Sequence, residues 1–346
     1  MRQVILLGTP GTKRTVYLEK AARSLDVPIK LLDWKEGDWR RLLADRQTRG
    51  PWEMLLKIDP PVWDSCCLED LDRLARNYEK DLKALAGLEK EVVFFNNPLD
   101  MARLLDKRQC KRDLEGSGIP VTRLLGEEIR DTEHLLEAME RKNMSQVFLK
   151  PVRGSGAAGA AAFRYQKKTG HMVLYTCGME DPNTGRLVNT KRLRRFTDRS
   201  QVLSLLERIL KLDSIVERWY AKAEYQGFSY DLRAVVQRGQ VDFVLARLSK
   251  GPITNLHLNN HPLRASQLGL PGPIMEQVEE LCLQTARCYK GINSLGLDIL
   301  LEKRSLRPRI IELNGQGDLI YQDIYSENRI YRHQAEIMKE WLYGED

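Results

Sequence analysis

The chain of 346 residues carries 55 Lys and Arg against 48 Asp and Glu, a formal net charge of +7, and it is 42% hydrophobic and 30% charged. This composition is typical of a soluble globular protein, and the length predicts two or three sub-domains because one core rarely serves so many residues. No run of about 18 uncharged apolar residues is present, so we expect no membrane span.

The distribution of charges and the spacing of the cysteines indicate which partners the protein binds and in which cellular compartment it lies. Basic and acidic residues are interspersed, and neither an aromatic-basic RNA motif nor a zinc-finger spacing accompanies them, so we expect no nucleic-acid partner. None of the six cysteines forms a Cys-x-x-Cys pair, which predicts reduced thiols in a cytoplasmic protein. The apolar run at the start is too short for a signal peptide and indicates a first strand. The composition leaves a homo-oligomer open.

The first ninety residues begin as a βαβ unit, which implies a parallel sheet covered by helices. We expect strands at 4–7, 29–32, 52–59 and 92–95 and helices at 13–25 and 68–88. The loop at Gly8 lacks the G-x-x-x-x-G-K-[S/T] spacing of a phosphate loop, so it is interpreted as a plain strand-to-helix turn. The segment Asn96-Asn97-Pro98 is expected to mark the boundary between the first domain and the next.

The next segment carries a glycine-rich loop. After expected helices at 98–115 and 132–142 and a strand at 147–150, residues 154–159 match G-x-G-x-x-G letter for letter. A Rossmann unit needs a long helix after this motif, whereas 160–166 is short and 171–176 indicates another strand. The pattern favours a glycine flap between two strands that wraps phosphates with Lys150 beside it; a purely structural hairpin is the alternative.

A basic segment follows. Residues 181–199 are dense in Lys and Arg and are expected to form a loop, either a solvated face or a docking surface for an acidic substrate or peptide. A helix at 201–211, a strand at 214–220 and a hairpin at 230–248 that turns at Gly239 come next. Further helices are expected at 273–289 and 324–342.

A second hairpin, 296–314, gathers oxygen ligands. Because alternate side chains of a strand share a face, Glu312 and Asn314 point the same way, and Asp298 can sit beside them from the neighbouring strand. Two carboxylates and a carboxamide on an apolar sheet favour a hard cation such as Mg²⁺. The alternative is an exposed face with ordinary acidic residues.

The polar positions taken together resemble the ATP-grasp superfamily, as in glutathione synthetase, D-alanine–D-alanine ligase and the ribosomal-protein glutamate ligases. The resemblance covers 97–315 and implies an α/β fold with α+β sub-domains, in which a βαβ domain (1–96) precedes central (97–213) and C-terminal (214–346) grasp sub-domains. It is carried by Lys111, Lys150 with loop 154–159, Glu217, Glu224, Asp231-Leu-Arg233, Arg247, Thr254-Asn255, Asp298 and Glu312-Leu-Asn314.

The resemblance implies ATP and Mg²⁺ (or Mn²⁺) as cofactors and assigns roles. Catalytic residues would be Arg233, Arg247 and Asn255, and metal ligands Asp298, Glu312 and Asn314. A salt bridge to Asp231 is the alternative for Arg233. Nucleotide contacts would come from Lys111, Lys150, Gly154, Ser155, Gly156, Glu217, Trp219, Tyr220 and Glu224.

The implied activity is an ADP-forming carboxylate–amine ligase that acts through an acyl-phosphate on small-molecule or peptide substrates. A kinase on the same scaffold and a nucleotide-binding structural protein without turnover are the alternatives. The family's Pro-Gly turn after the metal-binding Asn is missing, so the acceptor pocket cannot be carried over. Tyr321, Tyr325 and Tyr331 either form its wall or anchor the last helix.

Overall fold

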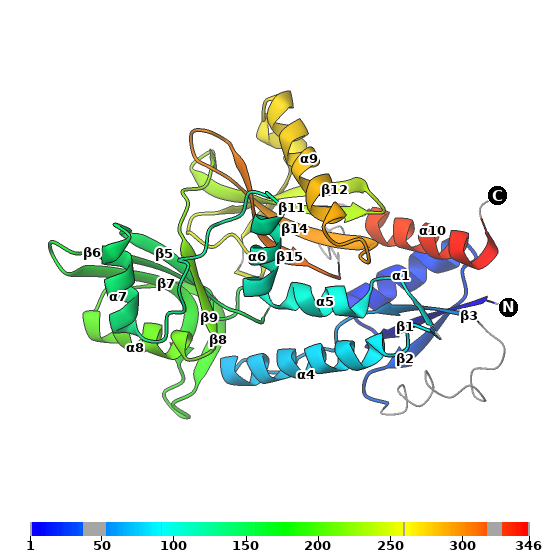
Figure 1. The fold of residues 1–346 in the computed structure, drawn as a ribbon, viewed down its shortest axis with the longest axis horizontal. Helices are drawn as coiled ribbons and strands as arrows, with labels where there is room; N and C mark the ends of the chain where they lie inside the picture. Colours follow the sequence, from blue (N-terminus) through cyan, green and yellow to red (C-terminus); the bar gives the residue numbers. More distant parts are fainter. Residues whose placement is uncertain are drawn as a thin grey trace.

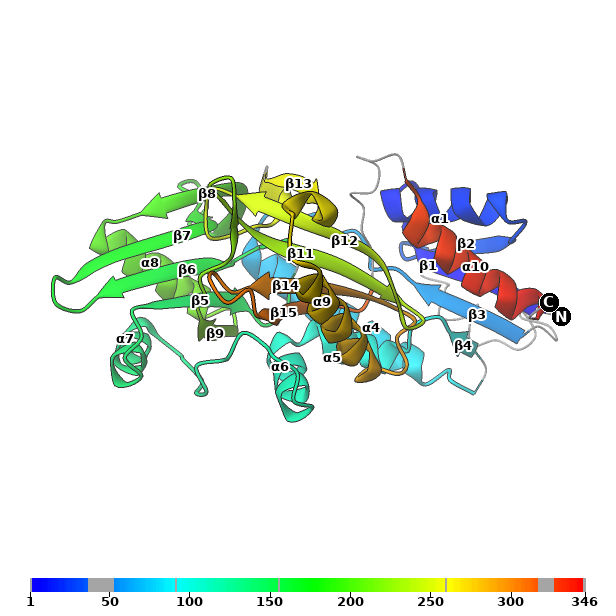
Figure 2. The same ribbon diagram turned by 90° about the horizontal axis from the view of Figure 1, so that it is seen from above.

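Three β-sheets and the helices between them make up the described part of the chain (Figure 1). The computed structural model describes residues 2–36, 53–90, 92–154, 156–258, 260–316 and 327–344. Among these residues no helix is long and apolar enough to cross a membrane. Viewed from above, the N-terminal sheet lies at one end, the central sheet at the other and the C-terminal sheet between them (Figure 2).

The N-terminal sheet is parallel, with strand order β2-β1-β3-β4. Its apolar strands are buried on both faces, as parallel sheets require. One face packs on α1, whose first turn is capped by the Thr12 side chain; the other packs on α4 and α5. The elements are β1 (Arg2–Gly8), α1 (Lys13–Ser24), β2 (Ile29–Asp33), β3 (Glu53–Ile58), α4 (Leu68–Ala86), β4 (Val92–Phe94) and α5 (Pro98–Leu105).

The central sheet is antiparallel, in the order β8-β7-β6-β5-β9. Alternate residues of β5 show why it separates two environments: Val147 and Leu149 are buried against α7 and α8, while Phe148 and Lys150 face a cavity. The elements are α6 (Lys107–Gly116), α7 (Thr132–Arg141), β5 (Gln146–Pro151), β6 (Ala161–Gln166), β7 (His171–Glu180), β8 (Leu187–Phe196), α8 (Arg199–Leu210) and β9 (Ser214–Arg218).

The C-terminal sheet runs β13-β12-β11-β14-β15, with β10 on β11. The expected hairpin at 296–314 is confirmed as β14 and β15, and α9 packs against the sheet. The elements are β10 (Glu224–Tyr225), β11 (Phe228–Gln237), β12 (Gln240–Ser249), η1 (Leu256–Leu258), β13 (His261–Arg264), η2 (Ala265–Leu268), α9 (Gly272–Arg287), β14 (Ser294–Leu301), β15 (Pro308–Asn314) and α10 (Arg329–Tyr343).

The last helix returns to the first domain. The buried residues of α10 pack on α1 and the N-terminal sheet, and the Tyr331 ring stacks on that of Tyr17 at 5.8 Å. Arg2 donates to the carbonyl of Trp341 at 2.8 Å, so the two ends of the described chain lie side by side (Figure 2). The segment that we expected within the C-terminal sub-domain therefore completes the core of the N-terminal one.

Two expectations about local structure are wrong. Residues 187–196 form strand β8 and not a loop, because an edge strand tolerates the charged side chains that hid its alternation. The helix expected at 98–115 is two helices, broken at Asp106, whose side chain caps α6 by accepting from the amides of Arg108 and Gln109. The rejection of a Rossmann unit is confirmed, since β5 and β6 are antiparallel neighbours.

Candidate active site

A cavity of about 720 Å³ lies between the central and C-terminal sheets and is also lined by the first turn of α1. Its walls come from β5 and the glycine loop, from β9, from β11, β12, β14 and β15, and from the first turn of α1. The residues are Lys13, Arg14, Lys107, Thr122, Phe148, Lys150, Pro151, Gly154, Gly156, Ala157, Ala158, Ala160, Glu217, Arg218, Tyr220, Lys222, Asp231, Arg233, Arg247, Pro252, Ile253, Thr254, Asn255, Asp298, Leu300, Ile311, Glu312 and Asn314.

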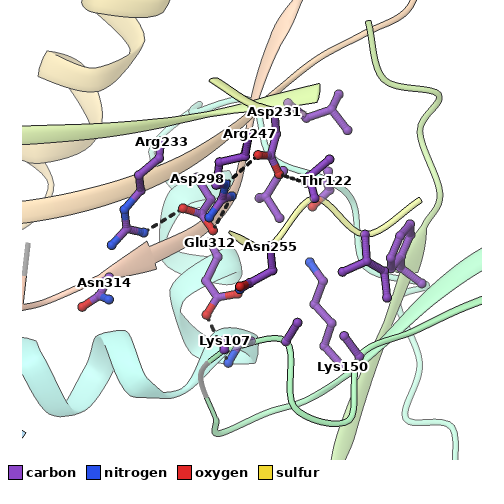
Figure 3. Close-up of a pocket in the computed structure, with 18 of the residues that line it drawn as sticks. Lys107, Thr122, Lys150, Asp231, Arg233, Arg247, Asn255, Asp298, Glu312 and Asn314 are labelled. Carbon is purple, nitrogen blue, oxygen red and sulfur yellow. Dashed lines mark hydrogen bonds and ion pairs between the residues drawn. The ribbon is translucent and has the colours of Figure 1, made fainter. Parts of the chain in front are cut away.

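The hairpin of β14 and β15 carries the three predicted metal ligands to this cavity. Asp298 lies opposite Glu312 and Gly296 opposite Asn314 in the antiparallel register, and all three oxygen-bearing side chains line the cavity (Figure 3). Two carboxylates and a carboxamide are a donor set that suits a hard cation. Among the described residues no group of three or more His, Cys, Asp and Glu is clustered as a metal site, and the role of these three residues as metal ligands stays a prediction.

Two arginines hold the Asp298 carboxylate. Arg233 Nη1 lies 2.7 Å from Oδ1 and Arg247 Nη2 lies 2.9 Å from Oδ2 (Figure 3). Burial raises the pKa of Asp298, but Arg247 and Arg233 outweigh burial and lower the pKa well below its usual range. The salt bridge considered between Arg233 and Asp231 is not the one formed; Asp231 accepts from Arg247 Nε at 2.8 Å.

Arg247 is therefore fixed between two carboxylates. It is 5% exposed, and although burial lowers its pKa, Asp231 and Asp298 raise it further above its usual value. Asp231 also accepts from the Thr254 hydroxyl and pairs with Lys222 Nζ at 3.3 Å. This chain of charges positions the loop that carries Asn255 at the cavity wall.

A second buried cluster centres on Glu217. Its Oε1 pairs with Lys150, and its Oε2 pairs with Lys111 and accepts from the Thr122 hydroxyl, both at 2.8 Å. Burial raises the pKa of Glu217, but Lys111 and Lys150 together lower it to about 2. Lys150 lines the cavity. Lys111 does not, because Nζ also donates to the carbonyls of Thr122 and Ile311 at 3.0 Å.

The glycine loop lies over the cavity between β5 and β6. Gly154 and Gly156 have φ of 140° and 66°, a region that favours glycine, and Gly159 is required because a Cβ there would lie 2.6 Å from the Pro151 ring. Lys107 Nζ connects the loop to β15, since it lies 2.7 Å from the Gly154 carbonyl and 3.3 Å from Glu312 Oε1. The predicted Ser155 lies outside the described residues.

No protein-family model matches the chain, and no curated protein matches it by sequence. Solved structures, in contrast, match the chain by their fold. D-cycloserine synthetase DcsG aligns over 97% of this chain and 99% of its own at 12% identity and TM-score 0.59. The ATP-grasp ligase PsnB, complexed with minimal precursor, Mg and ADP, aligns over 97% of each chain at 14% identity and TM-score 0.58. D-alanine–D-alanine ligase from Bacillus anthracis aligns over 98% of this chain and 96% of its own at 12% identity and TM-score 0.55.

This chain has the ATP-grasp fold. The fold class expected from the sequence is confirmed. The fold brings Lys150, Gly154, Gly156, Glu217, Tyr220, Arg233, Arg247, Asn255, Asp298, Glu312 and Asn314 to one cavity, and their individual roles stay predictions.

Three of the predicted nucleotide contacts lie elsewhere in this ATP-grasp structure. Lys111 is behind the cavity wall. Trp219 is buried against Phe148 at a ring distance of 5.2 Å and does not line the cavity, whereas its neighbours Arg218 and Tyr220 do. Glu224 is exposed on β10 and pairs with Lys303 at 2.5 Å, away from the cavity.

Sequence reasoning missed five cations that line the cavity: Lys13, Arg14, Lys107, Arg218 and Lys222. The signal for Lys107 was available, since Asp106 is a good N-cap and moves the start of a helix to the next residue. Lys13 and Arg14 belong to another domain, and no motif within their own segment relates them to this site.

Proposed function

We propose that the chain is an ATP-dependent, ADP-forming ligase that joins a carboxylate to an amine through an acyl-phosphate. The observation that carries this proposal is Arg247, held rigid between Asp231 and Asp298 on the wall of a large cavity. A fixed, desolvated guanidinium stabilises developing oxyanion charge without reorganisation. The ATP-grasp fold and the nearby hairpin of oxygen ligands support the same reaction.

ATP would lie with its base at the apolar end of the cavity and its phosphates under the glycine loop. Phe148, Leu300 and Ile311 supply the apolar walls. Lys150 and Lys107 bring positive charge to the phosphates as compact ammonium groups. Solved neighbours with AMPPNP or with Mg and ADP support this choice of cofactor.

Asp298, Glu312 and Asn314 would hold the Mg²⁺ (or Mn²⁺) ion. When bound, the ion supplies charge neutralisation on the phosphate oxygens. Asp298 turns both carboxylate oxygens toward arginines, so Glu312 and Asn314 offer the more accessible oxygens at this edge.

In the reaction, a substrate carboxylate oxygen attacks the γ-phosphorus, and the bond from that phosphorus to the oxygen of ADP breaks. The amine then attacks the acyl carbon, phosphate leaves with its bonding electron pair, and the nitrogen loses a proton. Arg233 and Arg247 stabilise the charge that develops in both steps. Lys13 and Arg14 bring further positive charge to the cavity, where they would orient the carboxylate substrate.

The test is product analysis. Purified protein is incubated with ATP, Mg²⁺ and pools of carboxylates and amines, and phosphate release and mass spectra are recorded. We expect phosphate only when both pools are present, with a product lighter by one water than the sum of its substrates. A phosphorylated substrate without condensation would contradict the ligase and indicate a kinase.

Glu312→Gln is the matched control for this assay. Its side chain keeps its shape, and among the described residues Glu312 forms one ion pair, to Lys107, so we expect the free energy of unfolding to stay within about 1 kcal/mol. Phosphate release should be abolished. Unchanged turnover would contradict the assignment of Glu312 as a metal ligand.

A further inference from the structure

Both ends of the glycine loop at 154–159 contact helix α4 of the first domain. At the start of the loop, Arg153 Nε donates to Glu79 Oε2 at 2.5 Å. At its end, a Cβ built at Gly159 would lie 3.5 Å from Cδ1 of Leu68, the first residue of α4. Figure 1 shows α4 running from the N-terminal sheet toward the central sheet. The loop is therefore fixed to an element outside its own sub-domain.

Arg153 joins three carboxylates that come from three different segments. Besides its bond to Glu79, its Nη1 lies 3.3 Å from Asp213 Oδ2 in the turn before β9, and its Nη2 lies 3.6 Å from Asp106 Oδ2 at the start of α6. The Arg153 side chain is 13% exposed, so solvent screens these pairs less than it screens surface pairs. Because a guanidinium is a rigid planar fork of donors, carboxylates on several sides fix its orientation.

The same segments also hold the main chain from which the loop emerges. The Val152 amide donates to the Asp213 carbonyl at 2.8 Å, and the Val152 carbonyl accepts from the Lys107 amide at 3.2 Å. Burial raises the pKa of Asp213, but Arg108 and two further arginines outweigh burial and lower the pKa below its usual value. The Asp213 carboxylate therefore stays charged at neutral pH and available to Arg153.

The glycines make this attachment consequential. A glycine-rich segment loses more conformational entropy on ordering than any other, so a loop whose start is fixed loses less when it closes over a ligand. Neither Glu79 nor Leu68 is among the described residues that line the cavity. Any effect of these α4 residues on a ligand in the cavity must therefore pass through the loop.

We propose that Arg153 is a positioning residue that attaches the glycine loop to α4, so that Glu79 of the first domain sets the affinity of the cavity for nucleotide phosphates. The attachment does not depend on the reaction, whereas its effect on ATP rests on the proposed function. The first domain then takes part in nucleotide binding through a residue that does not touch the nucleotide.

The first test compares the binding of ATP·Mg²⁺ and of adenosine to the full chain by calorimetry. Glu79→Gln keeps the shape of the side chain and removes its charge, so the affinity for ATP·Mg²⁺ should fall about tenfold. Adenosine has no phosphate for the loop and should bind as it does to the wild type. Lys83→Gln is the matched control, because Lys83 pairs with the same carboxylate at 2.6 Å from the next turn of α4, and ATP affinity should stay within about threefold.

A double-mutant cycle separates this coupling from general damage. Arg153→Met alone and Arg153→Met combined with Glu79→Gln should lose ATP affinity equally, because Glu79 acts through Arg153. Additive losses in the double variant, an equal loss in Lys83→Gln, or a parallel loss of adenosine binding would each overturn the proposal.

The second test uses no nucleotide. Hydrogen exchange measured by mass spectrometry should be faster in peptides that span the glycine loop in Glu79→Gln and in Arg153→Met, with exchange in β6 unchanged. Wild-type rates in the loop of both variants would overturn the attachment. A wild-type protein that fails to bind ATP while its variants show the faster loop exchange would contradict the proposed function and support the attachment.

Discussion

At the level of single residues, two lysines of one cluster differ in what they face. Lys111 and Lys150 both pair with Glu217, but only Lys150 lines the cavity. The sequence shows both as basic residues in the right order along the chain. It does not show that the carbonyls of Thr122 and Ile311 bind Lys111, because these contacts join segments far apart in sequence.

We predict that replacing either lysine separates stability from nucleotide binding. Lys111→Met and Lys150→Met each leave the buried Glu217 with one lysine and the Thr122 hydroxyl, so each should lower the free energy of unfolding by about 3 kcal/mol. Only Lys150→Met should also weaken ATP·Mg²⁺ binding measured by calorimetry at a temperature where both variants are folded. An equal loss of ATP affinity in Lys111→Met would contradict the structural role assigned to Lys111.

The same cluster predicts a dependence of stability on pH. The pKa of Glu217 is lowered from 4.5 to about 2, so its contribution is fully present above pH 4.5 and is lost as pH falls through the folded-state pKa. This shift corresponds to about 3 kcal/mol. Urea denaturation at intervals from pH 6 to pH 2 should show that loss, and Glu217→Gln should show a shallower slope. Parallel slopes in the two proteins would rule the cluster out as its source.

At the level of elements, the pattern of apolar and polar residues predicted the hairpin of β14 and β15 but did not predict strand β8. The apolar residues of β14 and β15 predicted a paired hairpin, whereas the register shift between Asp298 and Ile299 is seen only in the structure. In β8 the charged residues occupy both faces, and its identity as a strand depends on pairing with β7. Likewise, the break between α5 and α6 depends on a single capping residue within a continuous helical pattern.

The packing of the β14–β15 hairpin also explains why residue 296 is a glycine. A Cβ at Gly296 would lie 2.6 Å from Arg233 Nη2, so Gly296→Ala should push this guanidinium away from Asp298. We expect turnover to fall about a hundredfold with the fold retained, because a displacement of about 1 Å has this effect on catalysis. Gly116→Ala, where a Cβ meets nothing within 4 Å, is the control. Normal turnover in Gly296→Ala would show that the position of Arg233 is not critical.

At the level of the whole molecule, the sequence predicted the order of the sub-domains better than the contacts between them. The ATP-grasp fold followed from polar positions spread over two thirds of the chain. The entry of Lys13 and Arg14 into the cavity did not, because it depends on how the first domain packs on the others. The tyrosines at 321 and 325 lie outside the described residues. Tyr331 is buried on Tyr17 and anchors the last helix.

The return of α10 to α1 sets a constraint on synthesis. Val4, Leu6 and Leu55 belong to the same apolar cluster as Ala335 and Met338, nearly the full length of the chain away. During translation this side of the first sheet cannot reach its final packing until the last helix has left the ribosome. The nascent first domain therefore carries exposed apolar surface while the residues between β4 and α10 are synthesised, which makes it a natural client for chaperones.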